Sequence, residues 1–302
     1  MKPAALTAWL DRGPRVLDGA MGSELLRLGG QAADTLWGVG TLMRQPDLVR
    51  EVHRRHAAAG AEALTAATFR IAPHSLRRIG AADRAAELAG FAVRLAREGA
   101  AQAGKEALVF ASQTTLEDCY RPDLVPDQST LEREHRATAE GLASAGADAL
   151  LLETFNTVRE ARAAAAAATA TGLAVLVSFA CGRRARLLSG EDVGEAAAAV
   201  VQEGVAAVGI NCTRVPDVMA ALDRVAASCD LPLVAYGNNA WFAEDSPWLS
   251  AEPVDPARYG CAALAWLAAG ARLVGGCCGT TPEHVAAVAG VVRTWRADRG
   301  LQ

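Results

Sequence analysis

The chain has 302 residues, of which 51% are hydrophobic, and it carries a formal net charge of -4 at pH 7 with a pI of about 5.8. This length can bury the core of one large domain, and a chain without a concentrated basic surface is a poor partner for nucleic acids. The apolar run near the N-terminus stops at Asp11 and Arg12, and no later stretch reaches the ~20 apolar residues that span a bilayer, so we expect a soluble, cytoplasmic protein that enters no membrane.

Seven cysteines are spread along the sequence. In a reducing cytosol thiols do not pair into a disulfide framework. The cysteines are therefore candidates for metal binding or catalysis, or for simple burial in the core.

Strand-like and helix-like segments alternate along the whole chain. Apolar runs typical of strands occupy residues 15–22, 62–69, 107–115, 149–155, 174–181, 206–213, 231–238 and 272–279. Segments with helical periodicity lie between them, with the clearest at residues 46–60, 130–148 and 282–298. Alternation of this kind predicts parallel strands joined by crossover helices, and eight units in 302 residues favour a closed α/β barrel of the (β/α)8 TIM type. No linker marks a second domain, so we predict one barrel domain over residues 1–302.

Two long irregular segments, residues 116–128 and 239–256, follow the third and seventh predicted strands. Long loops at these positions are candidates for lids over the mouth of the barrel. The second contains Trp241, Phe242 and Trp248, whose rings could attract a methylated cation or serve only as packing.

Each predicted strand turns polar at its carboxyl end, which is where barrel enzymes carry their active sites. The strand-end residues, in chain order, are Asp18, Thr68, Gln113, Glu153, Ser178, Asn211 with Cys212, Tyr236 with Asn238, and Cys277 with Cys278. A purely structural sheet would not require polar residues at all eight ends.

Three of the cysteines form a candidate metal site. Cys212 closes the sixth strand, and the adjacent Cys277 and Cys278 close the eighth, so their backbones lie roughly 10 Å apart with one strand between them. Three thiolates favour zinc, and three protein ligands leave one tetrahedral position open for a substrate. Adjacent cysteines on an ideal strand would face opposite ways, so we expect the strand to break there, with Gly275 and Gly276 permitting positive φ.

Other interpretations of these cysteines stay open. A glycine-rich turn before a helix that starts at Thr281 and Pro282 can cradle a phosphate, and Cys277 with Cys278 could form a vicinal disulfide in air. A non-catalytic zinc-binding barrel would close its site with a fourth ligand, for which Cys181 is the candidate. Otherwise simple burial is expected for the remaining cysteines, which are Cys119, Cys181, Cys229 and Cys261.

Four segments, "VLDGAMGSEL", "GADALLLETF", "VGINCT" and "GARLVGGCCGTTPEH", in this order and spacing, resemble the zinc-dependent homocysteine S-methyltransferase family. The resemblance covers residues 15 to 289. It implies a (β/α)8 barrel, zinc held by Cys212, Cys277 and Cys278, and recognition of the amino-acid end of homocysteine by Asp18 and Glu153. We add Gly19 and Asn211 as substrate-binding candidates; Asn211 could donate to a zinc-bound sulfur or only satisfy a local turn.

The resemblance predicts transfer of a methyl group from a small onium donor to the thiol of homocysteine, giving methionine. S-methylmethionine and S-adenosylmethionine lead as donors, because no cobalamin or folate domain follows the barrel; betaine and a related thiol or selenol acceptor remain open. The segment "AYGNNAW" departs from the Tyr-Pro-Asn-Ser-Gly expected after strand seven, so the donor pocket can differ. A barrel lyase or aldolase using Glu153 and Asp18 as acid and base is the competing enzyme class, and the sequence leaves homo-oligomer formation open.

Overall fold

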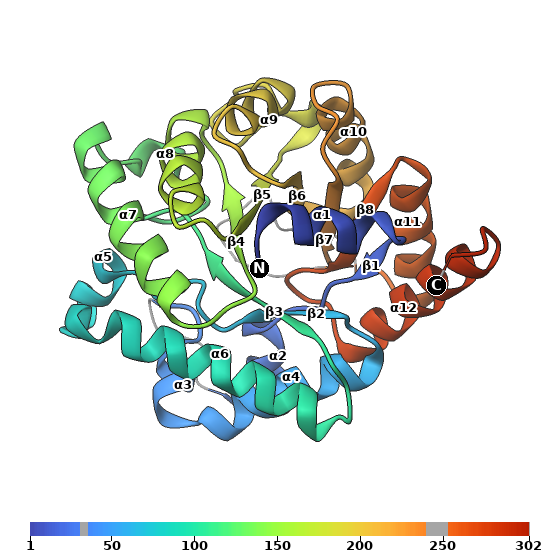
Figure 1. Ribbon diagram of the computed structural model, residues 1–302, viewed down its shortest axis with the longest axis horizontal. Coiled ribbons are helices and arrows are strands. Elements are labelled where there is room, and N and C mark those ends of the chain that lie inside the picture. Colours follow the sequence, from blue (N-terminus) through green and yellow to red (C-terminus); the bar gives the residue numbers. More distant parts are fainter. Residues whose placement is uncertain (31–35, 240–252, 302) are drawn as a thin grey trace.

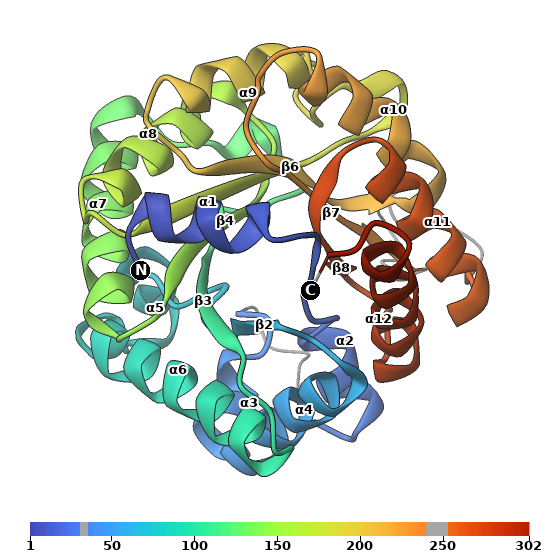
Figure 2. The same ribbon diagram turned by 45° about the vertical axis from the view of Figure 1, so that its right-hand side comes forward.

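Eight parallel strands form a barrel surrounded by helices (Figures 1 and 2). The computed structural model describes residues 1–30, 36–239 and 253–301. The hydrogen-bonded strand order is β1-β8-β7-β6-β5-β4-β3-β2, and a parallel bridge between Leu17 and Ala63 joins the two ends of the sheet. The strands are β1 Arg15–Val16, β2 Ala63–Ala66, β3 Leu108–Gln113, β4 Ala149–Phe155, β5 Ala174–Ala180, β6 Ala207–Arg214, β7 Leu233–Asn238 and β8 Ala271–Gly276. The predicted (β/α)8 TIM-type barrel is confirmed.

One long helix follows each strand and packs on the outside of the barrel. These helices are α4 Pro46–Ala59, α6 Ala85–Gln102, α7 Gln128–Ser144, α8 Val158–Thr169, α9 Val193–Val201, α10 Val215–Ala226, α11 Pro256–Ala268 and α12 Pro282–Ala297. Shorter elements lie in the loops, namely α2 Gly22–Arg27, α3 Val39–Arg44, α5 Pro73–Leu76, η1 Arg77–Ile79, η2 Ala82–Arg84, η3 Pro122–Leu124 and η4 Arg183–Ala185. In the described part of the chain, no helix is long and apolar enough to cross a membrane.

Strict alternation along the strands separates two apolar layers. On β4, Ala149 and Leu151 belong to the cluster inside the barrel, whereas Leu150 and Leu152 pack outward against the helices. Glu153 continues the inward-facing series into the mouth of the barrel. The alternation therefore decides which polar residues at the strand ends can reach a central site.

The opposite end of the barrel is closed by α1 Pro3–Asp11, which lies across the opening in Figure 2. Its Leu6 and Leu10 are completely buried in the inner cluster. The amide of Ala174, at the first residue of β5, donates to Met1 O at 2.9 Å and ties the start of the chain to this end. The side chains of α1 thus fill this end of the barrel, which leaves the carboxyl-terminal mouth as the place to look for a ligand site.

Candidate active site

A cavity of about 500 Å³ lies at the carboxyl ends of the strands. This is within the size range of pockets that enclose a small-molecule ligand. Its wall combines residues from strand ends and from the following loops, including Asp18, Gly19, Trp37, Thr65, Phe69, Arg70, Ser112, Cys119, Tyr120, Glu153, Cys212, Tyr236, Cys277 and Cys278. The predicted active-site end of the barrel therefore contains a real cavity.

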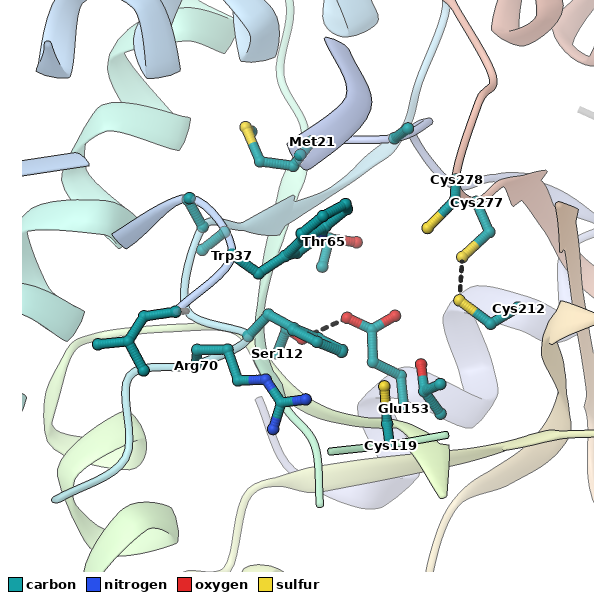
Figure 3. A pocket seen from close by; sticks show the side chains of 18 of the residues that line it. Met21, Trp37, Thr65, Arg70, Ser112, Cys119, Glu153, Cys212, Cys277 and Cys278 are labelled. Carbon is teal, nitrogen blue, oxygen red and sulfur yellow. Dashed lines mark hydrogen bonds between the residues drawn. The ribbon is translucent and has the colours of Figure 1, made fainter. Parts of the chain in front are cut away.

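Three cysteine side chains converge on one side of this cavity (Figure 3). The sulfur atoms of Cys212, Cys277 and Cys278 all lie within 4.8 Å of one another, and Cys212 Sγ is 2.8 Å from Cys277 Sγ. No other group of three potential metal ligands is this close among the residues that the structure describes. All three thiols are free, so the vicinal disulfide between Cys277 and Cys278 is not formed.

A left-handed backbone conformation aims Cys212 at the cavity. Asn211 faces the barrel interior, so strict alternation would turn the next side chain outward. Instead Cys212 has φ 45°, and the pairing of β6 with β7 shifts register between Asn211 and Arg214. A positive φ at a residue with a side chain is costly and is found mainly where function requires it. The irregularity is therefore what allows a strand-six cysteine to meet the strand-eight pair.

The strand-eight cysteines lie where the strand has ended, as predicted. β8 stops at Gly276, and a tight turn follows in which Thr280 donates to Cys277 O through both its amide and its hydroxyl. The expected positive φ at Gly275 and Gly276 is wrong, because the left-handed residue of this turn is Gly279, with φ 78°. At Gly275 the missing side chain instead makes room, since an added Cβ would lie 2.7 Å from Asp18 O.

The chemistry of the three thiols fits a metal ion. Tetrahedral zinc with bonds of about 2.3 Å separates its sulfur ligands by roughly 3.8 Å. The three sulfurs lie within 4.8 Å of one another, and Cys212 and Cys277, whose sulfurs are 2.8 Å apart, would separate by about 1 Å to hold the ion. Contact with the Cys277 thiol, together with burial, raises the pKa of Cys212 well above its usual range. Contact with Cys212 and burial do the same to the pKa of Cys278. Such thiols ionise together only beside a compensating positive charge, which a divalent cation provides.

Asp18 lies just beyond β1 and points into the cavity. Its carboxylate accepts hydrogen bonds from the Thr65 amide at 2.7 Å and the Thr65 hydroxyl at 2.9 Å. Burial raises the pKa of Asp18 to about 8, although both bonds from Thr65 act against that shift. A buried carboxylate that hydrogen bonds hold in place, with no basic side chain paired to it, is suited to a cationic ligand.

Glu153 is the second buried carboxylate of the cavity. It accepts hydrogen bonds from the Ser112 hydroxyl and, at 3.1 Å, from the Tyr236 hydroxyl. Burial raises the pKa of Glu153 to about 7. Within the described residues neither Glu153 nor Asp18 forms an ion pair, so no basic side chain there compensates either carboxylate.

The two other predicted substrate residues lie close to the cysteines. Gly19 lines the cavity, and an added Cβ there would lie 2.8 Å from His56 Cε1, so close packing requires the glycine. Asn211 lies beneath the wall instead. Its Oδ1 accepts from the Thr154 amide at 2.9 Å and its Nδ2 lies 4.0 Å from Cys277 Sγ. This places Asn211 against both the sulfur group and the β4 irregularity at Thr154, whose φ is 65°.

Of the predicted strand-end residues, Ser178, Asn211 and Asn238 do not line the cavity, and on β2 and β3 the prediction chose the wrong residue. Thr68 follows β2 and donates to Ser112 O, and Gln113 faces outward to His135, so neither lines the cavity. Their places are taken by Thr65 and Ser112, which support the two carboxylates and which the sequence analysis missed. Counting every second residue forward along each strand, from the residues that face the inner core, would have found both.

The four remaining cysteines do not share one environment. Cys181 and Cys119 are buried, Cys229 is half-buried and Cys261 is exposed. Cys181 lies outside the sulfur group, so the fourth protein ligand suggested for a non-catalytic site is absent from the described residues. The expected burial is confirmed for Cys119 and Cys181 and is wrong for Cys261, which is exposed. Cys119 also lines the cavity.

The first predicted lid does reach the cavity, since Asp118, Cys119 and Tyr120 of the loop after β3 line it. Most of the second, with Trp241, Phe242 and Trp248, lies outside the described residues. Trp37 is an aromatic wall residue that the sequence analysis did not single out. Its ring lies so close to Gly22 that an added Cβ there would be 2.5 Å from Trp37 Nε1.

A barrel with three convergent cysteines and two buried carboxylates at its mouth has the site of a metal-binding barrel enzyme. The chain matches the family model described as Homocysteine S-methyltransferase over residues 15–292, and it belongs to that family. It is 33% identical to Homocysteine S-methyltransferase of Escherichia coli (strain K12), covering 90% of this chain and 93% of that one. It is also 28% identical to Homocysteine S-methyltransferase YbgG of Bacillus subtilis (strain 168), over 92% and 94% of the two chains.

The comparison with solved structures points to the same family. It is similar to the homocysteine methyltransferase MmuM from Escherichia coli in its metallated form, with a TM-score of 0.80, 33% identity, and coverage of 94% of this chain and 99% of that one. The resemblance of the sequence to the homocysteine S-methyltransferases is thereby confirmed, and the protein is a methyltransferase.

Proposed function

We propose that this protein transfers a methyl group from a small sulfonium donor, S-methylmethionine or S-adenosylmethionine, to the thiol of L-homocysteine, with zinc held by Cys212, Cys277 and Cys278. The observation that carries the proposal is the convergence of these three sulfurs, within 4.8 Å of one another, on a cavity that also contains two buried carboxylates. A metallated relative with the same fold supports it.

The three cysteines would hold the ion through thiolates and leave one position for the acceptor. When bound, zinc would supply the positive charge that keeps a thiol ionised at neutral pH. Asn211, 4.0 Å from Cys277 Sγ, would orient that cysteine through its amide.

Asp18 and Glu153 would bind the ammonium group of homocysteine. Thr65 holds the first carboxylate, and Ser112 with Tyr236 holds the second, so neither needs to reorganise when the ligand arrives. The pairing would also lower the pKa of both carboxylates, because an adjacent positive charge favours their ionised form.

The reaction itself needs little acid or base assistance. Homocysteine loses its thiol proton to solvent, a sulfur–carbon bond forms to the donor methyl group, and the bond from that methyl to the sulfonium breaks. The electron pair of the broken bond stays on the donor sulfur, which leaves as a neutral thioether. The chain's task is to align the two sulfurs and keep water away, which a buried cavity accomplishes.

The test is to incubate the zinc-loaded protein with homocysteine and each donor in turn, betaine included, and to measure methionine by mass spectrometry. We expect methionine with a sulfonium donor and none after the zinc is removed by a chelator. Formation of methionine from betaine alone would overturn the donor assignment, and turnover that survives chelation would favour a metal-independent enzyme.

Replacing Cys278 with alanine should abolish both stoichiometric zinc binding and methionine formation, because two thiolates do not retain the ion at a three-cysteine site. The matched control is Cys261→Ala, which removes an exposed cysteine far from the sulfur group in sequence and should keep both. An active, zinc-free Cys278→Ala protein would refute the proposed ligand set.

A further inference from the structure

The cavity has a second part that the acceptor does not need. Homocysteine would occupy the side with the cysteines, Asp18 and Glu153, but the wall continues over Trp37, Phe69, Arg70 and Tyr120. A volume of about 500 Å³ is more than one small amino acid fills. Because the methyl donor must approach the acceptor sulfur from the open side, this second part is where the donor would lie.

Arg70 is the charged group of this second part. It follows β2, and its Nη1 donates to two carbonyl oxygens of the loop after β3, Thr115 O at 3.0 Å and Glu117 O at 2.7 Å. Its Cζ lies 5.2 Å from the centre of the Phe69 ring. These contacts use one nitrogen and fix the plane of the guanidinium, and among the described residues its other nitrogens have no hydrogen-bond partner. Figure 3 shows Arg70 beside the cavity.

The charge of Arg70 is not neutralised by the described part of the chain. Arg78, the other arginine on the cavity wall, pairs with Glu117, whereas Arg70 makes no ion pair there. Asp118, the acid on the adjacent wall, accepts instead from the Tyr120 amide at 2.9 Å. A half-buried, oriented guanidinium without an acidic partner is a receptor for an anion, and its fork matches a carboxylate in particular.

We propose that Arg70 binds the carboxylate of the methyl donor, so that the site selects sulfonium donors that carry an amino-acid carboxylate over those that lack one. This inference rests on the proposed function and deepens it. The opposite signs of the two parts of the cavity support it: Asp18 and Glu153 attract an ammonium beside the cysteines, and Arg70 attracts a carboxylate farther along the wall. The neighbouring aromatic rings can face the sulfonium charge between these ends.

The experiment compares two donors and two variants. S-methylmethionine carries the carboxylate, and trimethylsulfonium offers the same reactive centre without it. We expect Arg70→Gln to raise KM for S-methylmethionine by roughly 10- to 100-fold, the usual loss for a charged hydrogen-bond partner. KM for trimethylsulfonium and for homocysteine should stay unchanged, and Arg70→Lys should retain part of the preference.

The matched control is Arg77→Gln, which removes an arginine that pairs with Glu134 and does not line the cavity. Its ratio of kcat/KM for the two donors should equal that of the wild type. Arg70 also anchors a loop, so circular dichroism and thermal unfolding would confirm that each variant is folded. A loss shared equally by both donors, or a change confined to KM for homocysteine, would overturn the proposal.

Isothermal titration of S-methylmethionine into the zinc-loaded protein without homocysteine gives a readout that does not depend on turnover, because no methyl acceptor is present. Weaker binding to Arg70→Gln than to wild type supports the proposal, and equal binding overturns it. If the wild type binds S-methylmethionine through Arg70 but forms no methionine, the proposed reaction fails while the carboxylate site stands.

Discussion

The burial of Glu153 and Asp18 favours the ligand-bound protein over the empty one. Both carboxylates are buried among hydroxyl and amide donors, and burial raises the pKa of each, to about 7 for Glu153 and about 8 for Asp18. The protein therefore loses part of its own stability as the pH rises and these buried carboxylates ionise. Binding sites commonly carry such a cost in stability.

That cost can be measured as a pH dependence of stability. The pKa of Glu153 is about 7 in the fold and 4.5 in its ordinary state, so the folded protein holds this proton more tightly. The contribution to stability is complete below pH 4.5 and is lost as the pH rises through 7. It amounts to roughly 3 kcal/mol across that window.

Glu153→Gln mimics the protonated side chain, because the hydroxyls of Ser112 and Tyr236 can donate or accept. In the metal-free and ligand-free protein, we expect wild type and variant to be equally stable near pH 4, below the ordinary pKa of Glu153. Near pH 8 the variant should be the more stable by up to roughly 3 kcal/mol. Urea unfolding at each pH measures the difference, and a gap independent of pH would show that folding does not change the pKa of Glu153.

At the level of elements, the ends of β7 and β8 are fixed to each other from outside the barrel by one side chain of α11. The hydroxyl of Tyr259 donates to Gly237 O at 2.7 Å and to Gly275 O at 3.0 Å. Its ring packs edge-on against Trp266 and His284, with centroids 5.6 and 5.5 Å away. The turn that carries the cysteine pair therefore starts from a strand end held in place by a helix.

Tyr259→Phe should destabilise the protein by about 1–3 kcal/mol, because the ring remains and buried carbonyl groups lose a donor. The midpoint of urea unfolding would report the loss. Leu264→Ala on the same helix is the control, since Leu264 is 45% exposed and its replacement should change stability by no more than about 0.5 kcal/mol. Equal midpoints for Tyr259→Phe and wild type would mean that the hydroxyl does not fix the strand ends.

The sequence predicted the elements well and the side-chain directions less well. Strand and helix alternation determines a (β/α)8 barrel almost by itself, and the three cysteines at the ends of β6 and β8 were expected to meet. Thr68 and Gln113 were chosen because they were the last polar residues of their strands. Orientation follows alternation from the inner core instead, which selects Thr65 and Ser112.

Cys212 is a residue at which strand alternation gives the wrong side-chain direction. Alternation alone would turn it away from Asn211's side of the strand, and only the positive φ of 45° brings its sulfur to the cavity. A single sequence does not reveal a local conformation of this kind, because it depends on contacts such as the one between Asn211 and Thr154. The presence of three cysteines at the strand ends pointed to the site, and the structure explains how they reach it.

On the scale of the whole molecule, stability and chemistry lie at opposite ends of the barrel. The inner apolar cluster extends from Leu6 and Leu10 of α1 at the lower opening to Tyr236 in the wall of the cavity. Substitutions in the lower layers should therefore change the free energy of unfolding without altering the site. Barrel enzymes in general separate these properties in this way.

Leu10→Ala tests this separation, because Leu10 is completely buried and truncation leaves a cavity in the lower layer. We expect a loss of about 2–5 kcal/mol in the free energy of unfolding, measured with urea. Below the unfolding transition, kcat and both KM values should match those of wild type, as should zinc content. Ala8→Ser on the exposed face of α1 is the control and should leave stability nearly unchanged. A Leu10→Ala protein with full stability would show that α1 does not close the barrel in solution, and one with altered KM would show that the two ends are coupled through the inner core.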